Sequence, residues 1–240
     1  MFILVLSIGI SCNKPDPSKN TDSETTKDKL MVSSPITVVD YHNNINSSYK
    51  ILKKNNKWIV DKGEFGTLHN LTVDLKNGYI NIEIEMGDGP YVSQTALFKS
   101  KTNKKIVCFV TTSGSGLYGS DEIILYEFKN SRMKEITSTI LPEVSIDDVV
   151  SGQFNKKTLE AIRKINKSKT SVIWKYYKLP RYGTNIILSI GPGFPGSFKD
   201  QITEKELIMI EQLEKAIKQK ILFNFNTNTG KFEVSKISKK

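Results

Sequence analysis

Apolar and polar residues alternate with a period of two over much of the first half of the chain, and this alternation predicts β-strands. The clearest case spans residues 71–86, where two alternating runs flank the pair Asn77-Gly78. Because Asn-Gly readily adopts the positive φ angles of a type I′ turn, the sequence predicts a hairpin with a two-residue turn. In the predicted register, three apolar positions on one run face three on the other: Leu75 with Ile80, Val73 with Ile82, and Leu71 with Ile84.

Similar alternation predicts further strands near residue 51 and at residues 58–60, 95–99, 105–112, 122–128, 133–137, 171–178, 185–190, 221–226 and 231–235. Apolar residues at helical spacing predict helices over 157–166 and from Thr203 to about Lys218, with a capping box of Thr203 and Glu206. Ser145 with Asp148 indicates another helix start. The predicted fold is therefore α+β. An antiparallel β meander covers 36–140, and a mixed α/β segment with two or three helices covers 141–240, as one domain or two.

The composition is that of a globular protein, because 38% of the 240 residues are hydrophobic and 25% are charged. The chain has only two cysteines, Cys12 and Cys108, so no disulfide framework is expected. Cys108 lies in the apolar run 106–110, and we expect it to be a small buried residue. The longest apolar stretch is at residues 1–11, whereas a membrane-spanning helix needs about 20 residues. We therefore expect that the body does not span a membrane.

The first twelve residues combine an apolar core with small residues and then Cys12, after which the chain turns polar at Asn13. This pattern resembles the signal peptide of a bacterial lipoprotein. Gly9 stands where the common lipobox has Leu, and such loose lipoboxes resemble those of Bacteroidota-type bacteria. The resemblance implies cleavage before Cys12, acylation of its sulfur, and anchoring to a bacterial membrane, on the periplasmic or surface side of the outer membrane. The alternative is that this segment forms an ordinary N-terminal helix or buried strand.

Residues 12–35 follow the predicted signal peptide of residues 1–11. From Asn13 to Pro35 this segment contains no aromatic residue and is rich in Ser, Thr, Asn, Lys and acidic residues. Such a segment buries too little apolar surface to offset the entropy lost on ordering. The sequence therefore predicts a disordered tether between the lipidated Cys12 and the globular body.

Basic residues are concentrated between Lys156 and Arg181, a stretch whose only acidic residue is Glu160. Aromatic residues are interleaved with the second half of this stretch. The residues predicted to bind an anionic partner are Lys156, Lys157, Arg163, Lys164, Lys167, Lys175, Lys178 and Arg181, and those predicted to make aromatic contacts are Trp174, Tyr176 and Tyr177. The alternative is a solvated helix face above a strand whose aromatic residues belong to the core.

The sequence predicts no catalytic residue, metal site or cofactor. His42 and His69 lack metal-ligand spacing. Two Gly-x-Gly-x-x-Gly matches, at 114–119 and 191–196, lack the helix that must directly follow in a dinucleotide site. The leading hypothesis is a non-catalytic cell-envelope lipoprotein that binds an anionic lipid, glycan or protein; nucleic acid is not expected. The alternatives are an envelope hydrolase with carboxylates near Asp88 and Asp121, and a structural surface protein.

Overall fold

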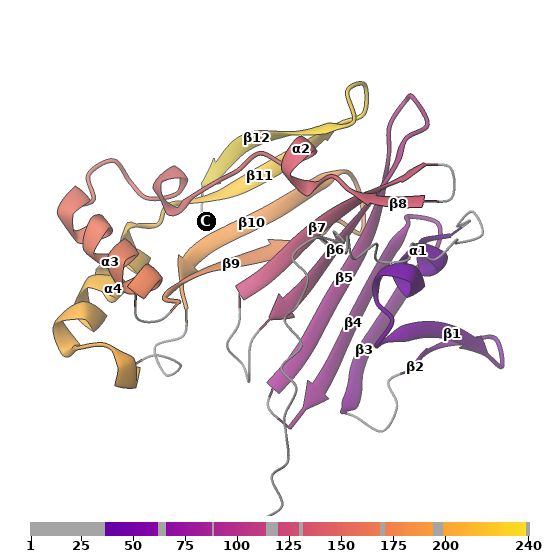
Figure 1. Cartoon of the computed structure of the whole chain (residues 1–240), viewed down its shortest axis with the longest axis horizontal. Helices are drawn as coiled ribbons and strands as arrows, with labels where there is room; N and C mark the ends of the chain where they lie inside the picture. Colours follow the sequence, from indigo (N-terminus) through magenta and orange to yellow (C-terminus); the bar gives the residue numbers. More distant parts are fainter. Residues whose placement is uncertain are drawn as a thin grey trace, which may run out of the picture. The chain divides into compact units, whose positions relative to one another are not determined.

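Twelve strands form three antiparallel sheets in the part of the chain that the computed structural model describes (Figure 1). This part comprises residues 37–61, 66–87, 89–113, 120–129, 132–168, 171–193 and 199–238, and it belongs to one unit, Met31–Lys240. The strands are β1 (Lys50–Lys54), β2 (Lys57–Asp61), β3 (Thr67–Asp74), β4 (Tyr79–Met86), β5 (Gly89–Lys99), β6 (Lys105–Ser113), β7 (Ser120–Lys129), β8 (Arg132–Glu135), β9 (Ile173–Lys178), β10 (Asn185–Pro192), β11 (Gln219–Asn226) and β12 (Lys231–Ser238). The predicted signal peptide, Cys12 and the tether lie outside the described residues.

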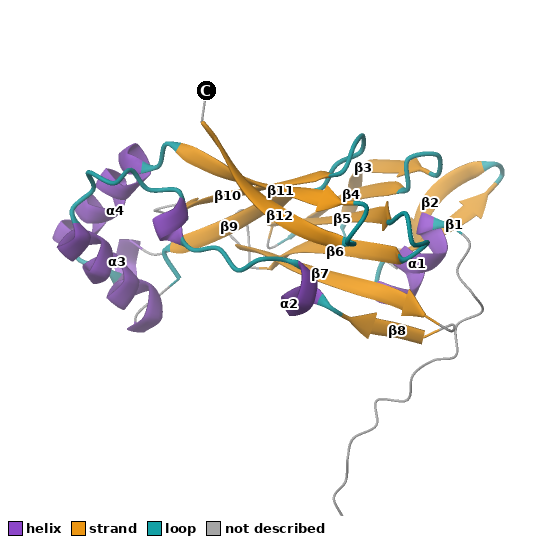
Figure 2. Ribbon diagram, turned by 90° about the horizontal axis from the view of Figure 1, so that it is seen from above, coloured by secondary structure: helices purple, strands orange, loops and turns teal. Residues whose placement is uncertain are grey.

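The first sheet is the β1–β2 hairpin, the second is a six-stranded meander from β3 to β8, and the third has the order β12-β11-β10-β9. The helices are α1 (Val38–Ile45), α2 (Thr137–Ile140), α3 (Lys156–Ser168) and α4 (Glu204–Ala216), with 3₁₀ turns η1 (Ile146–Asp148) and η3 (Lys199–Gln201). Figure 2 shows α3 and α4 together at one end of the four-stranded sheet. The structure thus confirms the predicted α+β class with antiparallel strands in the majority.

Both faces of the six-stranded sheet carry apolar side chains. On one face, Ile80, Ile82 and Ile84 pack with Val38 and other residues of α1 and the β1–β2 hairpin. On the opposite face, buried residues of β5, β6 and β7 pack in a second core with the four-stranded sheet, α3 and α4. Cys108 lies in this second core with no exposed surface, as predicted.

The β3–β4 hairpin has a different register from the predicted one. The turn contains four residues, 75–78, so Val73 faces Ile80 and Leu71 faces Ile82. The Asp74 carboxylate explains the longer turn, because it accepts hydrogen bonds from the backbone N (3.1 Å) and side-chain Nδ2 (2.9 Å) of Asn77. The predicted two-residue turn is therefore wrong. The shift equals two residues, so the side chains that remain paired keep their predicted faces, whereas Leu75 lies in the turn and is 48% exposed.

Helix α1 lies at the start of the segment 36–140, for which the sequence predicted a β meander and no helix. Thr37 caps it, with its hydroxyl accepting from the Asp40 backbone N and the Asp40 carboxylate accepting from the Thr37 N–H. His42 is fully buried between α1 and the sheet, where Nδ1 lies 2.8 Å from Thr95 Oγ1 and Nε2 lies 3.1 Å from the Tyr49 carbonyl. Burial lowers the pKa of His42 to about 4. This histidine therefore anchors α1 in its neutral form.

Candidate binding face on helix α3

Helix α3 carries the first half of the basic segment and is amphipathic. Its apolar residues Leu159, Ile162 and Ile165 are buried at helical spacing. The helix begins after Asn155, whose side-chain Oδ1 accepts hydrogen bonds from the backbone N–H groups of the second and third following residues. With the apolar side in the core, the opposite side exposes four lysines, Lys156, Lys157, Lys164 and Lys167, together with one acidic residue, Glu160. We call the four lysines the lysine face.

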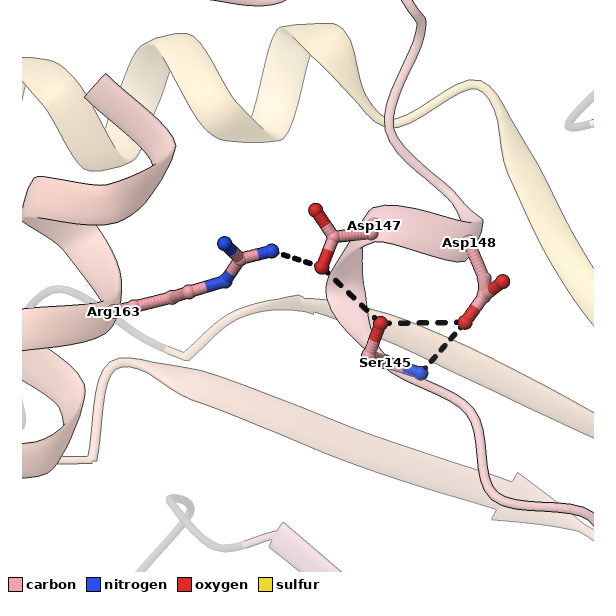
Figure 3. Close-up of polar contacts among 4 residues, drawn as sticks. All are labelled: Ser145, Asp147, Asp148 and Arg163. Carbon is pink, nitrogen blue, oxygen red and sulfur yellow. Dashed lines mark hydrogen bonds and ion pairs between the residues drawn. The ribbon is translucent and has the colours of Figure 1, made fainter. Parts of the chain in front are cut away.

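Arg163 lies beside the lysine face but is not part of it. Its guanidinium forms an ion pair with the Asp147 carboxylate of η1 (Figure 3). Ser145 and Asp148 cap the same turn, with the Ser145 backbone N donating to Asp148 Oδ2 over 2.9 Å. The predicted helix start at Ser145 is therefore a single 3₁₀ turn. This ion pair links the turn to α3, and the Asp147 carboxylate balances the positive charge of Arg163.

The three interleaved aromatic residues of β9 separate by strand parity. Tyr177 faces the second core and is 8% exposed, whereas Trp174 and Tyr176 are on the other face of the strand. Trp174 is 6% exposed, and its Nε1–H donates to the Ser171 carbonyl over 2.8 Å. Only Tyr176 among these three is exposed, at 41%.

The remaining basic candidates are dispersed. Lys175 is partly buried on the core-facing side of β9, with Nζ 3.3 Å from the Val144 carbonyl. Arg181 Nε donates to Asp74 over 2.9 Å. Hydrogen bonds from Asn77 and Arg181 lower the pKa of Asp74 to about 2. Lys178 is exposed at the end of β9. The segment 156–181 therefore does not form one continuous basic surface; its exposed, clustered part is the lysine face.

Two polar side chains of the six-stranded sheet bind the backbone of β9 and the residue after it. Asp121 Oδ2 accepts from the Tyr177 N–H over 2.6 Å, and Gln94 Oε1 accepts from the Leu179 N–H over 2.8 Å. Burial raises the pKa of Asp121, while its bonds to Tyr177 and Thr112 oppose the shift. Asp121, a candidate acid in the hydrolase alternative, thus joins two sheets. Sequence spacing offered no signal for these contacts because the partners are far apart in the chain.

The remaining residues singled out from the sequence are His69, Asp88 and the glycines of the two Gly-x-Gly-x-x-Gly matches. His69 pairs with Glu85 at the exposed edge strand β3 over 3.5 Å. Gly191 and Gly193 lie in and just after β10, whereas Asp88, Gly196 and the three glycines of 114–119 lie outside the described residues. Within the ranges that the structure describes, no three His, Cys, Asp or Glu side chains are grouped to hold a metal ion. Across the same ranges, no helix has both the length and the apolar character needed to cross a bilayer.

No protein-family model and no curated protein matches this sequence. Among solved structures, a domain of an uncharacterized protein from Porphyromonas gingivalis W83 is similar to this chain. The similarity covers 78% of this chain and 79% of that one, with 11% sequence identity and a TM-score of 0.49. A similarity at this level carries no inference about function.

Proposed function

We propose that this protein is a cell-envelope lipoprotein, acylated at Cys12, whose folded body is a non-catalytic module that binds an anionic partner through the lysine face of α3. The proposed anchoring in the cell envelope rests on the resemblance of residues 1–12 to a lipoprotein signal. The binding role rests on one observation: among the described residues, none of the four lysines of this face has an ion-pair partner, whereas Arg163 beside them has one.

The spacing of these lysines suits a partner with several negative charges. Lys157 and Lys164 are seven residues apart, which is about two turns and about 10 Å along the helix axis. Lys164 and Lys167 are neighbours on the helix surface at i and i+3. These distances are close to the Debye length of about 8 Å at physiological salt, so the positive charges repel one another. Glu160, which lies between Lys157 and Lys164 on the helix surface, offsets one of the four charges. An anionic partner relieves this repulsion, and flexible ammonium groups accommodate sulfate, phosphate or carboxylate equally well.

We expect the double variant Lys157→Glu/Lys164→Glu to bind a polyanion at least about tenfold more weakly than wild type at low salt, because each basic residue close to an anionic surface contributes about 1 kcal/mol. The measurement is a titration of the full chain with dextran sulfate. The matched control is Lys99→Glu/Lys101→Glu, which makes the same change in net charge at two exposed lysines remote in sequence. Equal weakening in both variants would show that net charge alone drives binding, and would contradict a site on α3.

A further inference from the structure

The β1–β2 hairpin is a second basic feature, distinct from α3. It forms a sheet of its own, and its turn residues Asn55 and Asn56 both have positive φ, 49° and 60°, as a tight hairpin turn requires. The hairpin carries four lysines and one acidic residue: Lys50, Lys53, Lys54, Lys57 and Asp61. It therefore has a net charge of +3, from four positive charges and one negative charge.

The two faces of the hairpin differ in their surroundings. Ile51 and Val60 form a cross-strand pair that is buried in the core beneath α1. On the other face, Leu52 stands opposite Ile59 and is 44% exposed. Since strand side chains alternate, Lys54 lies on this outer face beside Leu52. The outer face thus combines exposed apolar surface with positive charge.

Two lysines at the tip of the hairpin repel each other electrostatically. Lys54 and Lys57 are direct cross-strand partners, and like charges in this position destabilise a hairpin. Next to them, Lys53 Nζ lies over the Trp58 ring, 5.6 Å from its centroid. By the same alternation, Lys53 and Trp58 belong to the core-facing side of the hairpin, where Trp58 packs partly against the core. The outer face therefore presents Lys54 and Lys57 beside the exposed Leu52, a combination suited to phosphate groups at a lipid–water interface.

The base of the hairpin is firmly attached. The Asn43 side chain of α1 pairs with the Ile51 backbone in both directions, accepting from its N–H over 2.7 Å and donating to its carbonyl over 2.9 Å. Figures 1 and 2 show the hairpin and helix α3 at opposite ends of the described part of the chain. The hairpin also lies beside α1, with which the described part begins. A membrane at this end therefore lies at the other end of the described part of the chain from α3.

We propose that the outer face of the β1–β2 hairpin contacts the surface of an anionic phospholipid bilayer, with Lys54 and Lys57 bound to lipid phosphates and Leu52 placed at the interface. Charge complementarity selects the anionic surface, and the exposed leucine favours a bilayer over a soluble polyanion. The contact orients the body and adds to the membrane affinity of any acyl chain. It rests on residues of the hairpin and is independent of the lysine face of α3.

The test uses Trp58, next to Lys57 in the hairpin, to report that the hairpin is close to the bilayer, in the full chain. Trp174, the other tryptophan, is 6% exposed. Vesicles contain brominated phosphatidylcholine, with or without phosphatidylglycerol. We expect brominated lipid to quench tryptophan fluorescence strongly only when phosphatidylglycerol is present, and the variant Trp58→Phe to lose this quenching. Lys54→Glu/Lys57→Glu should reduce quenching to the level in phosphatidylcholine alone, whereas Lys157→Glu/Lys164→Glu should retain it.

A second variant, Leu52→Asn, separates the apolar contribution from charge, and it should weaken quenching while leaving net charge unchanged. Circular dichroism of each variant verifies the fold. Three results would overturn the proposal: no quenching in either vesicle, equal quenching in both, or loss of quenching to the same extent in the α3 double variant as in the hairpin double variant. The dextran sulfate titration tests the lysine face of α3 in a separate experiment. The proposal for the hairpin and the proposal for α3 can therefore fail independently.

Discussion

Replacing Gly193 by alanine is expected to lower the free energy of unfolding by about 3 kcal/mol, the upper end of the usual cost of overpacking a core. The Trp174 ring lies directly on this glycine, and an added Cβ would come within 2.3 Å of Cε2 and 2.5 Å of Cδ2. The ring cannot move freely, because its Nε1 is bonded to the Ser171 carbonyl and its strand is paired with β10. Urea unfolding of the purified chain measures the loss.

Gly191→Ala is the matched control, two residues earlier in the chain and within β10. The nearest heavy atom to its added Cβ is Ile217 Cδ1 at 3.5 Å, an ordinary van der Waals contact. We expect the control to remain within about 1 kcal/mol of wild type, since removal of a glycine also restricts the unfolded chain. Equal stability of the two variants would show that Trp174 does not pack on Gly193.

Acidification from about pH 7 to about pH 4 is expected to remove about 3 kcal/mol of stability through His42 alone. Burial lowers the pKa of this histidine from 6.5 to about 4, so the unfolded chain binds the proton first as the pH falls. Its contribution is fully present above pH 6.5 and is lost as the pH falls toward 4. The measurement is the urea-derived free energy of unfolding across this range.

The variant His42→Gln isolates the contribution of this one side chain. Its stability should depend less steeply on pH between about 6.5 and 4, even though it is less stable than wild type at neutral pH. Asp121 acts in the opposite direction, because burial raises its pKa in the folded state, and it is present in both proteins. Parallel curves for wild type and His42→Gln would exclude a buried neutral histidine.

Local patterns predicted most of the strands and both long helices, because each depends on residues close together in sequence. The predicted helix 157–166 corresponds to α3, and the Thr203 capping box begins α4 as expected. The β3–β4 register was missed because one side chain, Asp74, stabilises a longer turn than the Asn-Gly pair favours alone. Alternation fixes which face a side chain occupies, but the turn sets which residues are paired.

Helix α1 was missed although the sequence contains its signal, the pair Thr37 and Asp40 at capping-box spacing. The segment 36–140 was predicted to be a β meander, so no helix was expected at its start. The burial of His42 was not visible from sequence at all, because its partner Thr95 lies 53 residues away. Isolated polar residues gain their roles through such distant contacts, which no local pattern encodes.

The sequence also predicted only part of the candidate site in the basic segment 156–181. Counting charges between Lys156 and Arg181 located the lysine face of α3, but it also grouped residues that the fold separates. Strand parity directs Lys175 toward the core, and distant carboxylates pair with Arg163 and Arg181. Conversely, the lysines of the β1–β2 hairpin do not stand out as a cluster in the sequence. The turn at Asn55 and Asn56 brings them together.

Metabolic labelling with a fatty-acid analogue tests the central claim of a lipid-anchored envelope protein most directly. Wild type and Cys108→Ala should both carry the label in the membrane fraction, because Cys108 is buried in the core and Cys12 remains. Cys12→Ala should carry none and should leave that fraction. Labelling of Cys12→Ala equal to wild type, or a wild-type protein without label, would contradict the account.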